Sequence, residues 1–146
     1  MKERDGDIWK AIADYYVITT DGDVRKDGAA VMGRGVALQA KKRFSGIEYT
    51  LGRGIQLRGN HVKLIGRLIT FPVKHHWRQK ADLELIKRSA NELRNLINDL
   101  NVRNMFALPL RIALPRPGCG NGGLDWKSVK SWIEIVLDDR FTVYQI

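Results

Sequence analysis

Residues 114–126 read Leu-Pro-Arg-Pro-Gly-Cys-Gly-Asn-Gly-Gly-Leu-Asp-Trp and place four glycines in one short stretch. Residues 104–108 before it, Asn-Met-Phe-Ala-Leu, predict a buried strand, and residues 125–137 predict an amphipathic helix. In such an arrangement glycines let consecutive backbone N–H groups converge on an anion, and the helix start adds partial positive charge. The candidate walls of a phosphate site are therefore Gly118, Gly120, Gly122 and Gly123.

A glycine-rich connector is weak evidence by itself. Many such connectors in α/β proteins are only turns, and the spacing here matches neither the P-loop nor the Rossmann pattern. A second loop strengthens the hypothesis, because residues 29–37 read Ala-Ala-Val-Met-Gly-Arg-Gly-Val-Ala and open another predicted helix. Two such loops can hold a diphosphate between them.

The other elements predict the fold class. Residues 15–20, Tyr-Tyr-Val-Ile-Thr-Thr, predict a buried strand that ends at the turn Asp21-Gly22. Further strands are predicted at residues 62–65, 67–71 and 141–144. Helical periodicity runs from Val31 to Gly46, and from Asp82, a natural N-cap, to Leu100. This alternation predicts an α/β protein with a mixed central sheet covered on both faces, and such sheets bind ligands at the carboxyl ends of their strands.

Positive charge is unevenly distributed along the chain. The net charge is +9, and residues 25–103 carry 17 basic and 6 acidic side chains, against 3 basic and 6 acidic in residues 1–24. A field of this sign favours polyanionic ligands, either a nucleotide or a nucleic acid that carries one. A basic surface that is merely solvated is the alternative.

The bulk properties exclude several classes. A chain of 146 residues with 44% hydrophobic and 28% charged residues fits one globular domain. It contains neither an apolar run of membrane-spanning length nor the apolar block of a signal peptide, so we expect a cytoplasmic location and no membrane partner. The single cysteine, Cys119, excludes an internal disulfide and a multi-cysteine zinc site, and between two glycines it is better explained by packing than as a nucleophile.

Five motifs, in this order, resemble the macro domain family, which binds ADP-ribose. They are Gly6-Asp7-Ile8, the strand at residues 17–20, Val-Met-Gly-Arg-Gly-Val-Ala-Leu-Gln at 31–39, Phe-Pro-Val-Lys-His-His-Trp-Arg at 71–78, and residues 114–126. The last three are most similar to the branch of DNA ADP-ribosyl glycohydrolase antitoxins and the related glutamate-directed glycohydrolase. The resemblance covers nearly the whole chain and implies a single macro domain with three α/β/α layers.

The resemblance also implies the ligand contacts. Asp7 would accept a hydrogen bond from the adenine amino group, beside Ile8, although Asp7 is alternatively a turn residue. The two loops would enclose the diphosphate and the distal ribose, the ribose of ADP-ribose that carries the modified group. The remaining expected ligand-binding residues are Thr19, Asp21, Val31, Met32, Gly33, Gly35, Val36, Pro117, Gly118, Cys119, Gly120, Asn121, Gly122, Gly123 and Leu124.

Lys74 is the catalytic candidate, because it matches the lysine that acts on the anomeric carbon of the distal ribose in this branch. An amine that attacks this carbon must first lose its proton, which desolvation or nearby positive charge from His75, His76 and Arg78 would favour. A solvent-facing lysine is the alternative. The adjacent histidines lack the further ligands of a metal site, so we expect neither metal nor cofactor. Trp77 is better explained by loop packing than by stacking.

Two departures from the family pattern bear on activity. Ile18 and Asp21 stand nearest the places where many macro domains carry asparagines, so Asp21 or Asp27 would take over ribose contact, or else catalysis is altered or lost. Gly122 stands where glutamate-directed relatives carry an aspartate, and Asp125 is better explained as a helix N-cap. The second departure favours nucleic-acid-directed chemistry.

These features predict an ADP-ribosyl glycohydrolase that acts on modified nucleic acid or protein, with nucleic acid bound through the basic surface. The alternatives are a non-catalytic ADP-ribose reader, an ADP-ribose 1″-phosphate phosphatase, and a nucleic-acid-binding module without a nucleotide pocket.

Overall fold

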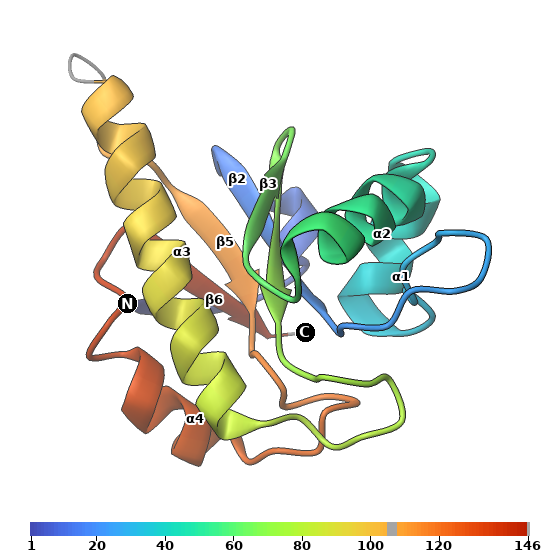
Figure 1. Cartoon of the computed structure of the whole chain (residues 1–146). Coiled ribbons are helices and arrows are strands. Elements are labelled where there is room, and N and C mark those ends of the chain that lie inside the picture. The colour runs from blue at the N-terminus through green and yellow to red at the C-terminus, as the bar shows by residue number, and fades with distance from the viewer. Residues whose placement is uncertain (105–107, 146) are drawn as a thin grey trace.

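The computed structural model describes residues 1–104 and 108–145, which form a six-stranded sheet with helices on both faces (Figure 1). The strand order is β1-β6-β5-β2-β4-β3. The strands are β1 (Lys2–Asp5), β2 (Tyr15–Thr20), β3 (Lys63–Ile65), β4 (Leu68–Pro72), β5 (Ile112–Pro115) and β6 (Phe141–Gln145). The helices are the short 3-10 helix η1 (Ile8–Lys10), α1 (Gly35–Arg43), α2 (Ile47–Arg58), α3 (Leu83–Arg103) and α4 (Trp126–Ile133).

Strand β2 lies at the centre of the sheet and determines where loops converge. It pairs in parallel with β4 on one side and β5 on the other, and only the short β3 runs antiparallel to its neighbour. The carboxyl ends of β2, β4 and β5 therefore meet at one edge, with Thr20 opposite Pro72 in the register. The chain leaves β2 and β5 toward different sides of the sheet, which is the arrangement that opens a crevice between the two loops.

Alternate residues of β2 divide the core into two layers. Val17 packs into the cluster beneath α3 and α4, whereas Ile18 packs into the cluster beneath α1 and α2, and both are fully buried. This period of two is what a strand buried on both faces requires. The predicted three-layer α/β/α fold is confirmed.

Most predicted elements are confirmed. They include the strands corresponding to β2, β3, β4 and β6 and the long helix α3, and the side chains of Asp82 and Asp125 cap α3 and α4 as expected. Helix α1 begins at Gly35 rather than Val31, because residues 31–34 form the loop itself, and α4 ends at Ile133 rather than residue 137. Among the described residues, no helix is both long and apolar enough to cross a lipid bilayer.

A strand was expected at residues 104–108. Residues 105–107 of it lie outside the described residues, and at residues 104 and 108 the prediction is wrong. Helix α3 continues to Arg103 and is capped at Asn104, while Leu108 is 87% exposed and belongs to no strand. The strand that leads into the glycine loop is β5, so the loop follows it after a single residue, Arg116. Strand β1 and helix α2 were not predicted.

Candidate functional site

A pocket of about 590 Å³ lies at the carboxyl ends of β2, β4 and β5, between the two glycine-rich loops. Lys74 and Asp21 line one part of it, beside Trp77. The other predicted site residues that line it are Thr19, Val31, Met32, Gly33, Gly35, Val36, Gly118, Gly120, Asn121 and Gly122. The structure thus brings together most of the residues that the sequence assigned to one site.

A second hollow, of about 600 Å³, adjoins this pocket and shares five lining residues with it: Gly35, Val36, Pro115, Arg116 and Gly120. Its lining adds three predicted residues, Ile8, Cys119 and Leu124. The two adjoining spaces, here called the trough, suit a ligand with a middle section at the two loops and a group at each end.

Asp7, Pro117 and Gly123 are not part of either lining. The Oδ1 atom of Asp7 accepts a hydrogen bond from the N–H of Trp9 at 2.9 Å and caps η1, and the residue lines a separate hollow. Pro117 is buried, and the side of Gly123 that a Cβ would occupy faces the Lys80 side chain. Each is adjacent in sequence to a residue that lines the trough.

The first loop presents bare backbone to the pocket. A Cβ on Gly33 would meet nothing within 4 Å, and a Cβ on Gly35, whose φ is +57°, would approach only the Nδ2 atom of Asn121, at 3.6 Å. Arg34, the N-cap residue of α1, makes no side-chain capping bond. The first N–H groups of this helix are thus left for an anion, which the partial positive charge of the helix terminus also favours.

The second loop is held by packing. A Cβ on Gly122 would lie 2.4 Å from the carbonyl oxygen of Gly118 and 2.8 Å from the Cβ of Ala81. The N–H groups of Leu124 and Ala81 donate to the carbonyls of Gly118 and Gly122, both at 2.9 Å. Gly120, where a Cβ would again meet nothing within 4 Å, is the glycine of this loop with open space beside it.

Lys74 bridges the end of β4 and the second loop. Its Nζ donates to the carbonyl oxygens of Trp77 and Asn121, each at 3.4 Å, and the residue is half-buried. The preceding residue fixes its position, because the N–H of Val73 donates to the carbonyl of Thr20 on the neighbouring strand at 2.9 Å. An amine held in the pocket wall by two long hydrogen bonds can turn toward a bound ligand with little cost.

Asp21 lies in the same wall, directly after β2. Burial raises its pKa from 3.8 to about 6, against the opposing effects of the Asp23 N–H, which donates to its Oδ1 at 2.9 Å, and of the charge on Lys74. A carboxyl group with that pKa can accept or release a proton near neutral pH. Asp27, the other candidate for ribose contact, lies on an exposed turn and is not part of the pocket lining.

The two histidines are not part of the pocket lining. His75 contacts Asp82 and His76 contacts Asp23, each at 2.9 Å, and both rings are exposed. The expectation that they add net positive charge beside Lys74 is therefore weakened, since each faces a carboxylate. Within residues 1–104 and 108–145, no three His, Cys, Asp or Glu side chains are placed to hold a metal ion.

Cys119 has the properties of a packing residue. Burial raises the pKa of its thiol from 9.0 to about 11, and its Sγ donates to the carbonyl of Pro117 at 3.4 Å. A thiol that remains protonated at neutral pH is a poor nucleophile, as the sequence interpretation expected.

Sequence reasoning missed several pocket residues, among them Arg25, Arg34 and Arg116, and misread Trp77. Arg116 lines both parts of the trough, its guanidinium lies 5.1 Å from the ring centre of Trp126, and its buried Nε has no hydrogen-bond partner in the described part of the chain. The Pro-Arg-Pro sequence just after a strand was the available signal. Trp77, interpreted as loop packing, is instead 43% exposed at the pocket.

Comparison with known proteins gives a consistent set of relatives, although no family model matches the chain. The chain is 30% identical over 136 residues to the "DNA ADP-ribosyl glycohydrolase" of Mycobacterium tuberculosis, a match that covers 86% of this chain and 35% of that protein. It is 30% identical over 127 residues to "ADP-ribose glycohydrolase OARD1" of Bos taurus, covering 79% and 74%. The chain thus spans about a third of the length of the first curated relatives it matches.

A solved structure gives the same relationship in three dimensions. The "Macrodomain of Mycobacterium tuberculosis DarG" superimposes with a TM-score of 0.79 at 25% identity, covering 99% of this chain and 97% of that one. The likeness therefore extends over nearly the whole chain.

Proposed function

This chain belongs to the macro domain family, and we propose that it is an ADP-ribosyl glycohydrolase that releases ADP-ribose from a modified macromolecule through Lys74. One observation carries the proposal. The amine of Lys74 lies in the wall of the same pocket that two glycine-rich loops enclose. A cytoplasmic location remains a prediction.

The trough suggests how ADP-ribose is held. The diphosphate lies between Gly33, Gly35 and Gly120, where bare backbone and the start of α1 face the pocket. The adenosine extends toward Ile8 and Arg116, and the distal ribose lies beside Asp21 and Lys74. The adenine contact of Asp7 stays a prediction; in the structure its Oδ1 accepts from the N–H of Trp9 and caps η1.

The chemistry follows from these positions. Lys74 gives a proton to Asp21, and its Nζ then forms a bond to the anomeric carbon of the distal ribose while the bond from that carbon to the attached group breaks. The leaving group takes up the proton from Asp21. Water then adds to the anomeric carbon and displaces Nζ, which gives ADP-ribose and restores the lysine. A carboxyl group with a pKa of about 6 suits the second transfer, protonation of the leaving group near neutral pH.

Nucleic acid is the substrate that the second loop favours. A Cβ on Gly122 would lie 2.4 Å from the carbonyl oxygen of Gly118, so an aspartate side chain has no room there. Glutamate-directed relatives are expected to use an aspartate at this place, and this backbone cannot accept one without shifting. The net charge of +9 points in the same direction.

The test is Lys74→Ala, with Lys80→Ala as the matched control. Lys80 is an exposed lysine of the same connecting segment and is not part of the pocket lining. We expect Lys74→Ala to lose about a thousandfold or more in the release of ADP-ribose from a modified oligonucleotide, as removal of a nucleophile does, while its Kd for ADP-ribose changes little. Lys80→Ala should retain the parent rate.

Other outcomes separate the alternatives. Equal turnover by the Lys74→Ala protein would remove Lys74 from the mechanism. Tight ADP-ribose binding by the parent protein without turnover of any conjugate would favour a reader, and release of phosphate from ADP-ribose 1″-phosphate would favour a phosphatase.

A further inference from the structure

We propose that Trp77, together with Arg25 and Arg34 at the pocket mouth, forms a platform for the nucleobase that carries the ADP-ribose and for the strand attached to it. The inference rests on the proposed function. It assigns to the same pocket a substrate class, single-stranded nucleic acid, and the residues that recognise it.

The position of Trp77 relative to Lys74 is the first argument. The carbonyl oxygen of Trp77 accepts from the Nζ of Lys74 at 3.4 Å, and its N–H donates to the Oδ2 of Asp23 at 2.8 Å. The residue is thereby fixed beside the amine that we assign to the anomeric carbon. Whatever group is attached to that carbon must leave the pocket next to this residue.

The state of the indole ring is the second argument. Trp77 is 43% exposed and lines the pocket, and the guanidinium of Arg78 lies 4.9 Å from the centre of its ring. Bases of single-stranded nucleic acid stack on exposed aromatic rings of this kind, and nearby arginines strengthen the contact. A glutamate side chain offers no flat surface to such a ring.

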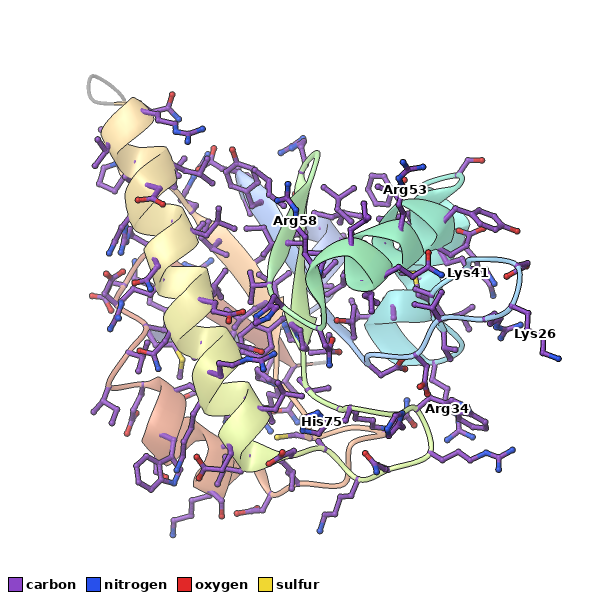
Figure 2. All side chains as sticks on the ribbon, viewed as in Figure 1. Lys26, Arg34, Lys41, Arg53, Arg58 and His75 are labelled. Atoms are coloured by element: carbon purple, nitrogen blue, oxygen red, sulfur yellow. The ribbon has the colours of Figure 1, made fainter. Side chains whose placement is uncertain are left out.

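The charge around the mouth is the third argument. Arg25 and Arg34 are exposed residues of the pocket lining. Figure 2 shows Arg34 near the loop of His75, and Lys26, Lys41 and Arg53 on the side of the molecule that carries α1 and α2. Six basic residues make no ion pair with a carboxylate of the described residues: Arg25, Lys26, Arg34, Lys41, Arg53 and Arg58. A phosphate backbone that leaves the pocket on this side meets uncompensated positive charge.

The experiment compares Trp77→Ala and Trp77→Phe on two substrates, an ADP-ribosylated single-stranded oligonucleotide and an ADP-ribosylated glutamate peptide. Loss of one stacked base corresponds to about a tenfold to hundredfold effect. We expect Trp77→Ala to raise KM for the oligonucleotide by that factor, Trp77→Phe to restore most of it, and the Kd for ADP-ribose to stay unchanged. An equal loss on both substrates, or an unchanged KM for the oligonucleotide, would overturn the platform.

Two matched controls isolate the effect. Trp132 of α4 is also exposed, at 46%, and also has a cation over its ring, Lys87 at 3.4 Å, but it is not part of the pocket lining. Trp132→Ala should leave KM unchanged. Arg34→Glu should reduce the slope of log affinity against log salt concentration by about one for the oligonucleotide, whereas Lys127→Glu on α4 should not.

Failure of the proposed function has a different signature. If the parent protein turns over neither substrate, the glycohydrolase assignment fails, and the platform is judged by binding alone. Tighter binding of the modified oligonucleotide than of ADP-ribose, lost in Trp77→Ala, would still support the platform. Equal affinity for the two ligands would overturn it.

Discussion

The loop before α1 and the loop after β5 are both rich in glycine, yet their glycines have different structural roles. At Gly33 an added Cβ would meet nothing within 4 Å, whereas at Gly122 it would lie 2.4 Å from a carbonyl oxygen. Gly118 is also required by the fold itself, because its φ is +75° and a Cβ there would lie 2.7 Å from the Cδ1 of Ile86. Gly120 resembles Gly33.

The difference separates two reasons for a glycine. Where a Cβ would collide with backbone, the glycine lets the loop fold against α3 and the segment before it. Where a Cβ would face open space, nothing inside the chain requires glycine, and a ligand that comes close to the backbone becomes the explanation. Only the second kind marks a binding surface.

The strongest test of this division is Gly122→Ala. The added methyl group forces apart the backbone at Gly118 and the side chain of Ala81, so we expect a loss of about 1–3 kcal/mol in the free energy of unfolding. Urea denaturation monitored by circular dichroism measures it. Gly120→Ala is the control in the same loop and should change stability by less than about 0.5 kcal/mol. Equal losses in the two variants would contradict the division.

The complementary test is Gly33→Ala, which should leave stability nearly unchanged and weaken ligand binding. Its Cβ would enter the space that we assign to the diphosphate, and displacing a charged group from backbone N–H donors costs about 1.5–3 kcal/mol per bond. The Kd for ADP-ribose, measured by calorimetry, should therefore rise by about tenfold or more. An unchanged Kd would show that this loop does not contact the ligand.

Sequence patterns located the loops but not the reasons for their glycines. Strand β2 and helix α3 were predictable because their periodicities are unbroken. Helix α2 was missed because Gly52 and Gly54 lower its helix propensity, and Gly52 is needed since a Cβ there would lie 1.9 Å from the carbonyl oxygen of Gly28. That contact between a helix and a distant loop leaves no local pattern.

The site shows the same limit. Lys74 followed from a motif, but the exposure of Trp77 and the unpartnered Nε of Arg116 depend on packing between elements far apart in sequence. The sequence does not show whether residues 112–115 or the apolar residues near 108 form the strand. The pairing of residues 112–115 with β2 and β6 identifies them as β5.

The smallest expected effect comes from a comparison of Asp21 and Asp27, two aspartates in turns that precede the first loop. The carboxylates of Asp21 and Asp27 each accept from the N–H two residues on, at 2.9 and 3.0 Å, but Asp21 lies in the pocket and Asp27 on an exposed tip. Because burial raises the pKa of Asp21 to about 6, the folded protein holds this proton more firmly than the unfolded chain does. This contribution to stability is fully present below about pH 4 and is lost as the pH rises through 6.

Asp21→Asn cannot ionise and keeps the oxygen that accepts from Asp23. The difference in Tm between Asp21→Asn and the parent should therefore become more positive from pH 4.5 to pH 8, by about 2 °C, since solvent screens part of the charge of a half-buried carboxylate. Differential scanning calorimetry across this range measures it. Asp27→Asn, at an exposed position outside the pocket lining, is the matched control. A flat difference for Asp21→Asn would mean that the carboxylate is well solvated, and the pocket wall beside Lys74 would then hold no group suited to take the proton of the lysine near neutral pH.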